Sequence, residues 1–525
     1  MIRTSVFAAV ALAFVSAAAP AQQRLQVIVD PRIELVSAVE ILTEQFGNLV
    51  SSSDTDYRRD LLSRFLPFKD HPAVARMAQL AGNGFNYDAP MQTMVCLSPP
   101  PELEWKAKPE ECSAERAGGA DSLRAWARQL RDFARESDFA AFFLAHSDLY
   151  ARMVEGARSK APHDYAADLE DYYGERQASY TVVLAPLLAK GNYGVRVKRA
   201  DASLDIYGII SSVNVSDGVA QFGGEENLRY MVWHEFSHSF VNPEFDRMPG
   251  AVERSGKLMG PIQKQMASQA YPDWKIAVNE HMVRAVTSRL AFRILGDAAG
   301  QATLERERAR GFAYVEALAG KLKEYEQNRQ RYPTFHDFAP QLVAVLDGLA
   351  ALNLPPEFYE TPFTGTIESA QRESGPTVLI VPTAETDGAA QRDLVVYVKR
   401  VQAQVLKDSE MLTDQEALVR DLSKCRIFAY GTLAGNLWLA RYKDLIPAVP
   451  VFAQMKEAGP LRLIAAMPNP QNSRRGVTAY TATQAAAVIG IHGLFHGPTA
   501  YVIGKENTVL KTGDYRQENG KWVLR

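Results

Sequence analysis

The chain has 525 residues, of which 47% are hydrophobic and 23% are charged, and its formal net charge is -3. This length is too great for a single hydrophobic core, so we expect two or three domains, and the composition excludes disorder on a large scale. The small net charge gives no reason to expect a nucleic acid or an anionic membrane as a partner.

The first residues have the pattern of an export signal. Arg3 supplies a positive charge, residues 6–19 form an apolar run, and small side chains suited to cleavage precede Gln22. The run is shorter than the ~20 residues of a membrane-spanning helix, and no later stretch is long and apolar enough to span a bilayer. We therefore expect a signal peptide over residues 1–21 and a mature chain that is exported, either periplasmic or secreted.

The part of the chain that follows is expected to be mainly helical with a small sheet. Apolar residues recur at helical spacing in several stretches, at residues 33–46, 57–65, 73–80 and about 122–173. β-branched and aromatic residues predict short strands at residues 25–29, 180–184 and 203–210. Two of these strands come shortly before a helix expected around residues 231–240, so a small sheet beside that helix is expected.

Three cysteines are present. Cys96 and Cys112 lie close together in a proline-rich segment, and an oxidising compartment would allow them to form a disulfide. Cys425 begins an apolar run, which is typical of a buried free thiol. We expect one disulfide, and we expect no cysteine to act as a metal ligand or nucleophile.

Residues 231–240 contain the pattern His-Glu-x-x-His inside an apolar run. In a helix, His234 and His238 are one turn apart, so their imidazoles lie on one face and supply half of a tetrahedral zinc site. Glu235 would lie beside the open position of the metal, and Pro243 is expected to end the helix. The alternative is an ordinary buried helix, because a five-residue pattern with two free positions also occurs by chance.

A catalytic zinc ion usually keeps three protein ligands and one open position. A second helix is expected over residues 273–295, and it carries Glu280 directly after an asparagine. Glu280 is therefore a candidate third ligand. Glu244 is the alternative, in the pattern of the metzincins, but that pattern requires a glycine where this chain has Val241. We expect Glu244 to be a solvated residue beyond the end of the first helix.

The combination of these two helices resembles the gluzincins, the thermolysin-like zinc peptidases, in which the third ligand is a glutamate on a later helix. Over its first ~340 residues the chain also resembles an uncharacterised bacterial family of secreted zincin-like proteins, chiefly at residues 234–243 and 278–285. The resemblance implies a zinc metallopeptidase and brings no substrate with it. Arg284 stands where thermolysin has an acidic residue, so the carboxylate that usually supports a zinc-bound imidazole must come from elsewhere.

The chemistry expected of such a site is hydrolysis of a peptide or protein substrate. Zinc would lower the pKa of its bound water to roughly neutral, and Glu235 would take the proton and pass it to the leaving amine. An edge strand beside the metal would hold the extended substrate, although the sequence does not say which strand. Candidate donors to the oxyanion are Arg284, His281, Tyr230 and His336. Arg284 could equally form an ion pair with Glu280.

The last ~150 residues differ in kind from the rest. Short apolar strands alternate with helical stretches, which predicts an α/β layer with parallel strands at residues 377–382, 426–431 and 461–466. The turn at Gly431-Thr432 could bind an anion, but no phosphate-loop signature is present, so a plain turn is favoured. We expect His492 and His496, in a later turn, to be structural.

The expected architecture is therefore an α+β fold in two parts. A mainly helical zincin-like domain with a small sheet would occupy residues 22–365, and a smaller α/β accessory domain would occupy residues 376–525. The expected activity is that of a secreted zinc metallopeptidase. A zincin-like binding or scaffold protein and a non-proteolytic zinc amidohydrolase remain alternatives, although Glu235 favours an enzyme because a structural zinc site needs no general base. The oligomeric state stays open.

Overall fold

The computed structural model describes residues 25–525 except residues 48, 52, 54, 162, 190, 217, 374, 456–458, 495–498 and 519. The predicted signal peptide and His496 lie outside the described residues. The chain mixes helices with several small sheets, so the predicted α+β fold is confirmed. Its buried apolar side chains form two separate cores, one within residues 25–350 and one within residues 363–515.

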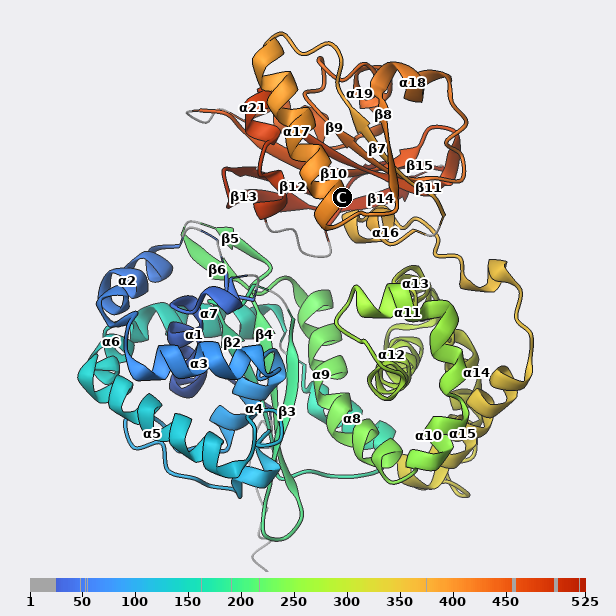
Figure 1. The fold of residues 1–525 in the computed structure, drawn as a ribbon. Helices are drawn as coiled ribbons and strands as arrows, with labels where there is room; N and C mark the ends of the chain where they lie inside the picture. Colours follow the sequence, from blue (N-terminus) through green and yellow to red (C-terminus); the bar gives the residue numbers. More distant parts are fainter. Residues whose placement is uncertain are drawn as a thin grey trace, which may run out of the picture.

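The first part of the chain forms two lobes, the left-hand one built around a four-stranded sheet (Figure 1). Across the sheet the strands are β1 (Leu25–Ile28), β2 (Ser179–Ala185), β4 (Leu204–Ser211) and β3 (Tyr193–Lys198). β1, β2 and β4 are parallel, and β3 runs antiparallel to β4. β3 is therefore an edge strand of this sheet.

Helices surround this sheet in the left-hand lobe of Figure 1. They are α1 (Pro31–Ile41), α2 (Asp56–Phe65), α3 (Pro72–Gly82), α4 (Asp88–Val95), α5 (Ala120–Glu136), α6 (Phe139–Ala145) and α7 (Ser147–Lys160). The predicted disulfide between Cys96 and Cys112 is confirmed, with a Cα–Cα separation of 6.3 Å, and Cys425 is free as expected.

The second lobe is helical, and α9 (Glu225–Asp246) stands between the two lobes. This helix buries side chains on both sides, including Trp233, Phe236 and Phe240, because it packs on β3 and β4 as well as on the second lobe. The other helices of this lobe are α8 (Tyr165–Tyr173), α10 (Pro249–Arg254), α11 (Met259–Ala267), α12 (Trp274–Leu295), α13 (Asp297–Ala309), α14 (Val315–Gln327) and α15 (Phe335–Ala351).

The prediction that Pro243 ends α9 is wrong. The helix continues to Asp246, and the Arg247 N–H still bonds to the Pro243 carbonyl. Proline in a helix removes its own N–H donor and crowds the carbonyl one turn earlier, but here the buried side chain of Phe245 keeps the last turn packed against the core. Glu244 is consequently a buried residue within α9, and the expectation that it is solvated is wrong as well.

The C-terminal domain contains a seven-stranded sheet with the order β13-β12-β10-β11-β9-β7-β8. β8, β7, β9 and β11 are parallel neighbours, whereas β10 is antiparallel to both of its neighbours. Parallel strands are therefore correct for the first two predicted strands and wrong for the third. The reason is a hairpin: only two residues separate β10 from β11, too few for a parallel crossover.

The elements of the C-terminal domain can be followed in the upper part of Figure 1. Its main strands are β7 (Thr377–Val381), β8 (Ser409–Thr413), β9 (Arg426–Tyr430), β10 (Arg462–Asn469), β11 (Asn472–Ala482), β12 (Tyr501–Lys505) and β13 (Thr508–Gly513). Its helices include α16 (Ile367–Gln371), α17 (Gly388–Gln404), α18 (Asp414–Val419) and α19 (Leu437–Tyr442).

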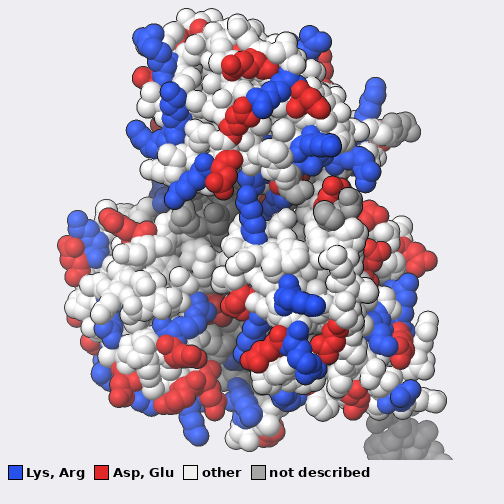
Figure 2. All heavy atoms as spheres, turned by 45° about the vertical axis from the view of Figure 1, so that its right-hand side comes forward, with Lys and Arg blue, Asp and Glu red and all other residues white. Residues whose placement is uncertain are grey.

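An ion-pair chain joins this domain to the start of α9. Glu226, in the first turn of α9, lies 3.3 Å from the Arg525 guanidinium and 2.8 Å from that of Arg306 on α13. On the face seen in Figure 2, acidic and basic side chains are interspersed, and the surface is recessed where the C-terminal domain meets the part below it. Among the described residues, no helix is both long and apolar enough to cross a membrane.

Candidate metal centre

His234, His238 and Glu280 converge where α9 packs on α12. The two histidines are one turn apart on α9, and α12 is started by Asp273, whose side chain accepts a hydrogen bond from the Ile276 N–H. One ligand atom of each converging residue lies within 4.8 Å of the others. The Nε2 atoms of His234 and His238 are 3.6 and 3.4 Å from the Glu280 carboxylate oxygens, longer than ordinary hydrogen bonds. This buried group could hold a metal ion.

Both imidazoles are held in a form suited to metal binding. The His238 Nδ1 lies 3.3 Å from the Asn242 side-chain oxygen, which can only accept, so the proton is on Nδ1 and the Nε2 lone pair faces the centre. Burial, reinforced by the charge of Arg284, lowers the pKa of His234 well below its usual value, so this ring is neutral. A neutral imidazole is the form that binds a metal.

A buried network of charged groups supports Glu280. The Arg284 guanidinium lies 3.0 Å from the Glu280 carboxylate and 2.7 Å from that of Glu307 on α13. The Tyr230 hydroxyl donates to Glu307 and accepts from Arg284 at 3.1 Å. The interpretation of Arg284 as an ion-pair partner of Glu280 is therefore confirmed. Glu307 supports Glu280 through Arg284, but the carboxylate expected beside a ligand imidazole is not found among the described residues: the His238 Nδ1 faces Asn242, and the His234 Nδ1 has no hydrogen-bond partner.

Glu235 points from α9 toward the sheet, at the place where β3 comes closest. A Cβ atom on Gly194 would lie 2.1 Å from the Glu235 carbonyl oxygen, so the strand can approach only because it has glycine here. Burial, and next the negative charge of Glu280, raises the pKa of the Glu235 carboxyl well above its usual value. A hydrogen bond from the Gly194 backbone N–H acts in the opposite direction.

Residues 25–345 match the model of a family described as Domain of unknown function (DUF4932). The chain belongs to this family. The DUF4932 match includes the four-stranded sheet, α9, α12 and all three converging side chains, and it ends before the C-terminal domain. No curated protein matches the chain.

Two of the four oxyanion donors expected from the sequence, His281 and His336, interact with other parts of the domain. The His281 Nδ1 is 2.7 Å from the Ala277 carbonyl, its ring packs on Phe312, and burial lowers its pKa to about 4. His336 is 58% exposed and lies 2.6 Å from Glu244. Because neither belongs to the converging group, the structure does not support His281 or His336 as donors to a ligand there.

The remaining two donors, Tyr230 and Arg284, are committed to Glu307, as described above. Glu244 interacts with His336 and Arg247, and the converging group includes Glu280 instead. The arrangement with Glu244 as third ligand is therefore not the one found.

Tyr271 is a neighbour of the converging group that sequence reasoning missed. Its hydroxyl lies 3.4 Å from the Arg284 guanidinium. Burial, and next the negative charge of Glu280, raises the pKa of Tyr271 to about 12, so the hydroxyl keeps its proton at neutral pH. The residue lies in the loop before α12, where no periodicity or spacing marks it.

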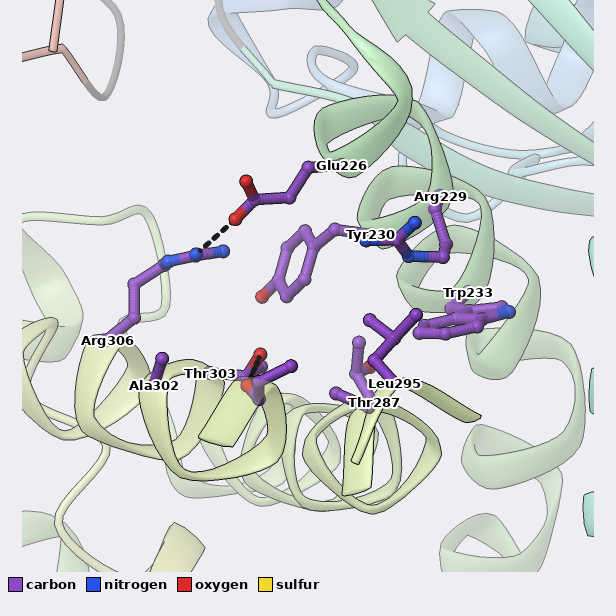
Figure 3. Close-up of a pocket in the computed structure, with 11 residues that line it drawn as sticks. Glu226, Arg229, Tyr230, Trp233, Thr287, Leu295, Ala302, Thr303 and Arg306 are labelled. Atoms are coloured by element: carbon purple, nitrogen blue, oxygen red, sulfur yellow. Dashed lines mark hydrogen bonds and ion pairs between the residues drawn. The ribbon is translucent and has the colours of Figure 1, made fainter. Parts of the chain in front are cut away.

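A pocket of about 290 Å³ lies between α9, α12 and α13, beside the metal group rather than at it (Figure 3). Trp233 and Leu295 supply apolar lining, and Glu226 and Arg306 form an ion pair at its rim. The Tyr230 ring lines this pocket and also stacks on the His234 ring at a centroid distance of 5.9 Å. Tyr230 therefore forms a wall between the pocket and the converging group.

The turn that could have bound an anion in the C-terminal domain is occupied by the chain itself. The Glu385 carboxylate accepts hydrogen bonds from the Thr432 backbone N–H at 2.6 Å and from the Thr432 hydroxyl at 2.7 Å. A Cβ on Gly435 would lie 2.1 Å from the Glu385 carboxylate, so the fit is close. The plain-turn interpretation agrees with this geometry. His492 likewise packs on Tyr430 and Tyr480.

Proposed function

We propose that this DUF4932 protein is a zinc-dependent metallopeptidase of the gluzincin type, with His234, His238 and Glu280 as metal ligands. The observation that carries the proposal is the convergence of these three buried side chains next to the carboxyl of Glu235. A structural zinc site is normally closed by four protein ligands and has no use for a general base.

The residues present fit zinc. Two neutral imidazoles and one carboxylate are the nitrogen and oxygen ligands of catalytic zinc sites, and three protein ligands leave a position open for substrate chemistry. When bound, zinc supplies a Lewis acid that makes water nucleophilic near neutral pH and offsets charge on a carbonyl oxygen. Asn242 orients His238 and Arg284 orients Glu280, whereas the His234 Nδ1 has no hydrogen-bond partner among the described residues.

Glu235 is assigned the proton transfers. Glu235 follows the first ligand directly in the chain, its carboxyl accepts a hydrogen bond from the Gly194 N–H, and the carboxyl lies close enough to Glu280 for that charge to act on it. A carboxylate beside a zinc-activated water can accept its proton and return it to the leaving nitrogen. The Tyr271 hydroxyl, which keeps its proton, is assigned the role of donor to the developing oxyanion.

β3 is assigned the role of substrate strand. It is paired with β4 on one side, and its other edge is open only in part, because the Gln92 side chain on α4 bonds to the Arg196 N–H at 3.1 Å and to the Arg196 carbonyl at 2.7 Å. An extended peptide can add to such an edge through backbone hydrogen bonds, which needs no particular side chains on the substrate. The disulfide between Cys96 and Cys112 supports the further proposal that the protein is exported, since disulfides persist mainly in oxidising compartments.

The test is cleavage of a peptide library by the full mature chain with bound zinc. We expect cleavage that a chelator abolishes and zinc restores, and a ~10²–10⁴-fold lower rate for Glu235→Gln with zinc content unchanged, because only the proton acceptor is lost. Glu244→Gln is the matched control, a buried carboxylate on the same helix outside the metal group. Cleavage that survives chelation, or full activity of Glu235→Gln, would contradict the proposal.

A further inference from the structure

The Gln92 side chain on α4 closes part of the outer edge of β3. Its amide nitrogen donates to the Arg196 carbonyl at 2.7 Å, and its amide oxygen accepts from the Arg196 N–H at 3.1 Å. A residue of an antiparallel strand exchanges the same two bonds with the residue opposite to it. The Gln92 amide therefore occupies the place that an added strand would need opposite Arg196.

The helix that carries Gln92 is anchored on both sides of it. α4, which lies beside β3 in Figure 1, packs on this strand and leads directly into the disulfide between Cys96 and Cys112. The neighbouring side chains of Met91 and Met94 are buried in the core. Because the core and the disulfide loop both hold α4, the amide of Gln92 is a fixed feature of this edge.

The closed position lies one step along β3 from the metal group. Gly194, two residues before Arg196, packs so closely on α9 that a Cβ atom would lie 2.1 Å from the Glu235 carbonyl oxygen. The Arg196 guanidinium donates to the His238 carbonyl at 3.3 Å. Alternate residues of a strand turn their backbone groups to the same edge, so Gly194 faces the same edge as Arg196. A peptide that reacts beside Glu235 thus pairs at Gly194 and meets Gln92 two residues further along.

The direction of the peptide decides which of its ends meets Gln92. Antiparallel pairing is the more stable arrangement per residue, and in it the peptide residue opposite Arg196 lies N-terminal to the one opposite Gly194. In the other direction β3 begins at Tyr193, so the C-terminal part of the peptide leaves the strand there and does not meet Gln92.

We propose that Gln92 limits the N-terminal side of the substrate site. The inference rests on the proposed peptidase function and names its substrate class: peptides cleaved within about two residues of their N-terminus, with no limit from Gln92 on the length that follows the cleaved bond. A side-chain amide suits this task because it satisfies the donor and the acceptor of Arg196 together, which leaves neither for an incoming chain.

Peptides of graded length test the inference with the full mature chain loaded with zinc. A sequence that the peptide library shows to be cleaved is lengthened stepwise with glycine and serine residues, in one series before the cleaved bond and in another after it. Mass spectrometry at early times gives kcat/KM for cleavage at the original bond, so removal of the added residues is counted separately.

We expect lengthening before the bond to lower kcat/KM at least about tenfold, the scale of one or two lost hydrogen bonds, and lengthening after it to have little effect. Gln92→Ala should remove most of this penalty, because the Arg196 groups become free to pair with the substrate. Gln92→Asn should act in the same way, since the shorter side chain does not reach both groups. Gln301→Ala, which replaces an exposed glutamine on α13, is the control and should keep the penalty. Thermal unfolding shows which variants are folded.

Three results would overturn the inference and leave the peptidase proposal standing. They are cleavage that does not depend on the length before the bond, a penalty for length after the bond instead, and a penalty that persists in the folded Gln92 variants. In each of them chelator-sensitive cleavage is still observed. If no peptide is cleaved at all, both proposals fail.

Discussion

The converging group lies within α9 and α12, whereas Glu385 and Asp414 lie at strand ends of the C-terminal sheet, and the two places differ in how their acceptors are matched. At the strand ends, Glu385 accepts from Thr432, and Asp414 accepts from the Thr383 hydroxyl at 2.6 Å and from the Leu437 N–H at 2.6 Å. At the converging group Arg284 donates to one Glu280 oxygen, but the facing nitrogen and oxygen atoms of the three side chains stand 3.4–3.6 Å apart, and among these described residues no hydrogen bond joins them. Acceptors matched by donors of the chain indicate structure, whereas acceptors that converge on one another indicate a ligand.

The largest expected effect comes from removing the third ligand of the metal group. Glu280→Ala should weaken zinc binding by more than about 100-fold and abolish cleavage, because a ligand costs more than the supporting residues, whose loss typically costs 10–100-fold. Competition with a coloured chelator measures the affinity. Glu244→Ala should lose contacts to His336 and Arg247 and some stability, yet keep its zinc affinity. A large loss of zinc from Glu244→Ala would refute this assignment of the ligands.

Glu40 provides a third case for this comparison. It is a buried carboxyl with an oxygen that has no partner in the described part of the chain, and it lies outside both the converging group and the C-terminal strand ends. Glu40 on α1 is 1% exposed, its Oε2 has no partner among the described residues, and burial raises its pKa to about 8. The folded state therefore favours the protonated form. The stabilising effect is complete below the unfolded pKa of about 4.5 and is lost as the pH rises through about 8.

Glu40→Gln removes this titration. The parent should lose stability relative to Glu40→Gln as the pH rises. We expect the free energy of unfolding of the variant minus that of the parent to increase by several kcal/mol from pH 5 to pH 9, since one pKa unit corresponds to about 1.4 kcal/mol. Chemical unfolding at several pH values gives the difference. A difference that stays constant over this range would mean that Glu40 is ionised in the folded protein.

The smallest expected effect is at the C-terminal strand ends. Glu385→Ala leaves the Thr432 donors without their acceptor, which should cost about 1–3 kcal/mol of stability and leave zinc affinity unchanged. Thermal unfolding and zinc titration measure the two quantities. Glu385→Gln, which keeps one acceptor oxygen, should lose less stability. If Glu385→Ala lowered zinc affinity as Glu280→Ala is expected to do, the strand-end carboxylates could not be called purely structural.

The sequence predicted those parts of the fold and site that depend on local spacing. The helical face of His234 and His238, the strand at residues 180–184 and the disulfide all follow from residues near one another in the chain. The end of α9 did not follow, because tertiary packing of Phe245 carries the helix past Pro243. The direction of β10 was missed because the strand–helix alternation of the preceding residues was extended to it, although Asn469-Pro470 marks the turn of the hairpin to β11.

The supporting parts of the site depend on packing between distant segments, so no local pattern marks them. Glu307 reaches Arg284 only because α13 packs against α12, and Tyr271 reaches it from a loop. The edge strand β3 was not predicted, although its apolar residues Tyr193, Val195 and Val197 alternate regularly with Gly194, Arg196 and Lys198. The glycine within this alternation is itself a signal of a close backbone approach.

The contact of Gly194 with the backbone of Glu235 also limits how this family can change over evolutionary time. The rest of β3 is constrained as well, because Tyr193, Val195 and Val197 are buried and Arg196 donates to the His238 carbonyl at 3.3 Å. An insertion or deletion of one residue between residues 191 and 194 would bring a residue with a Cβ atom against the helix and push the strand away. The spacing between the preceding turn and this glycine is therefore expected to stay fixed.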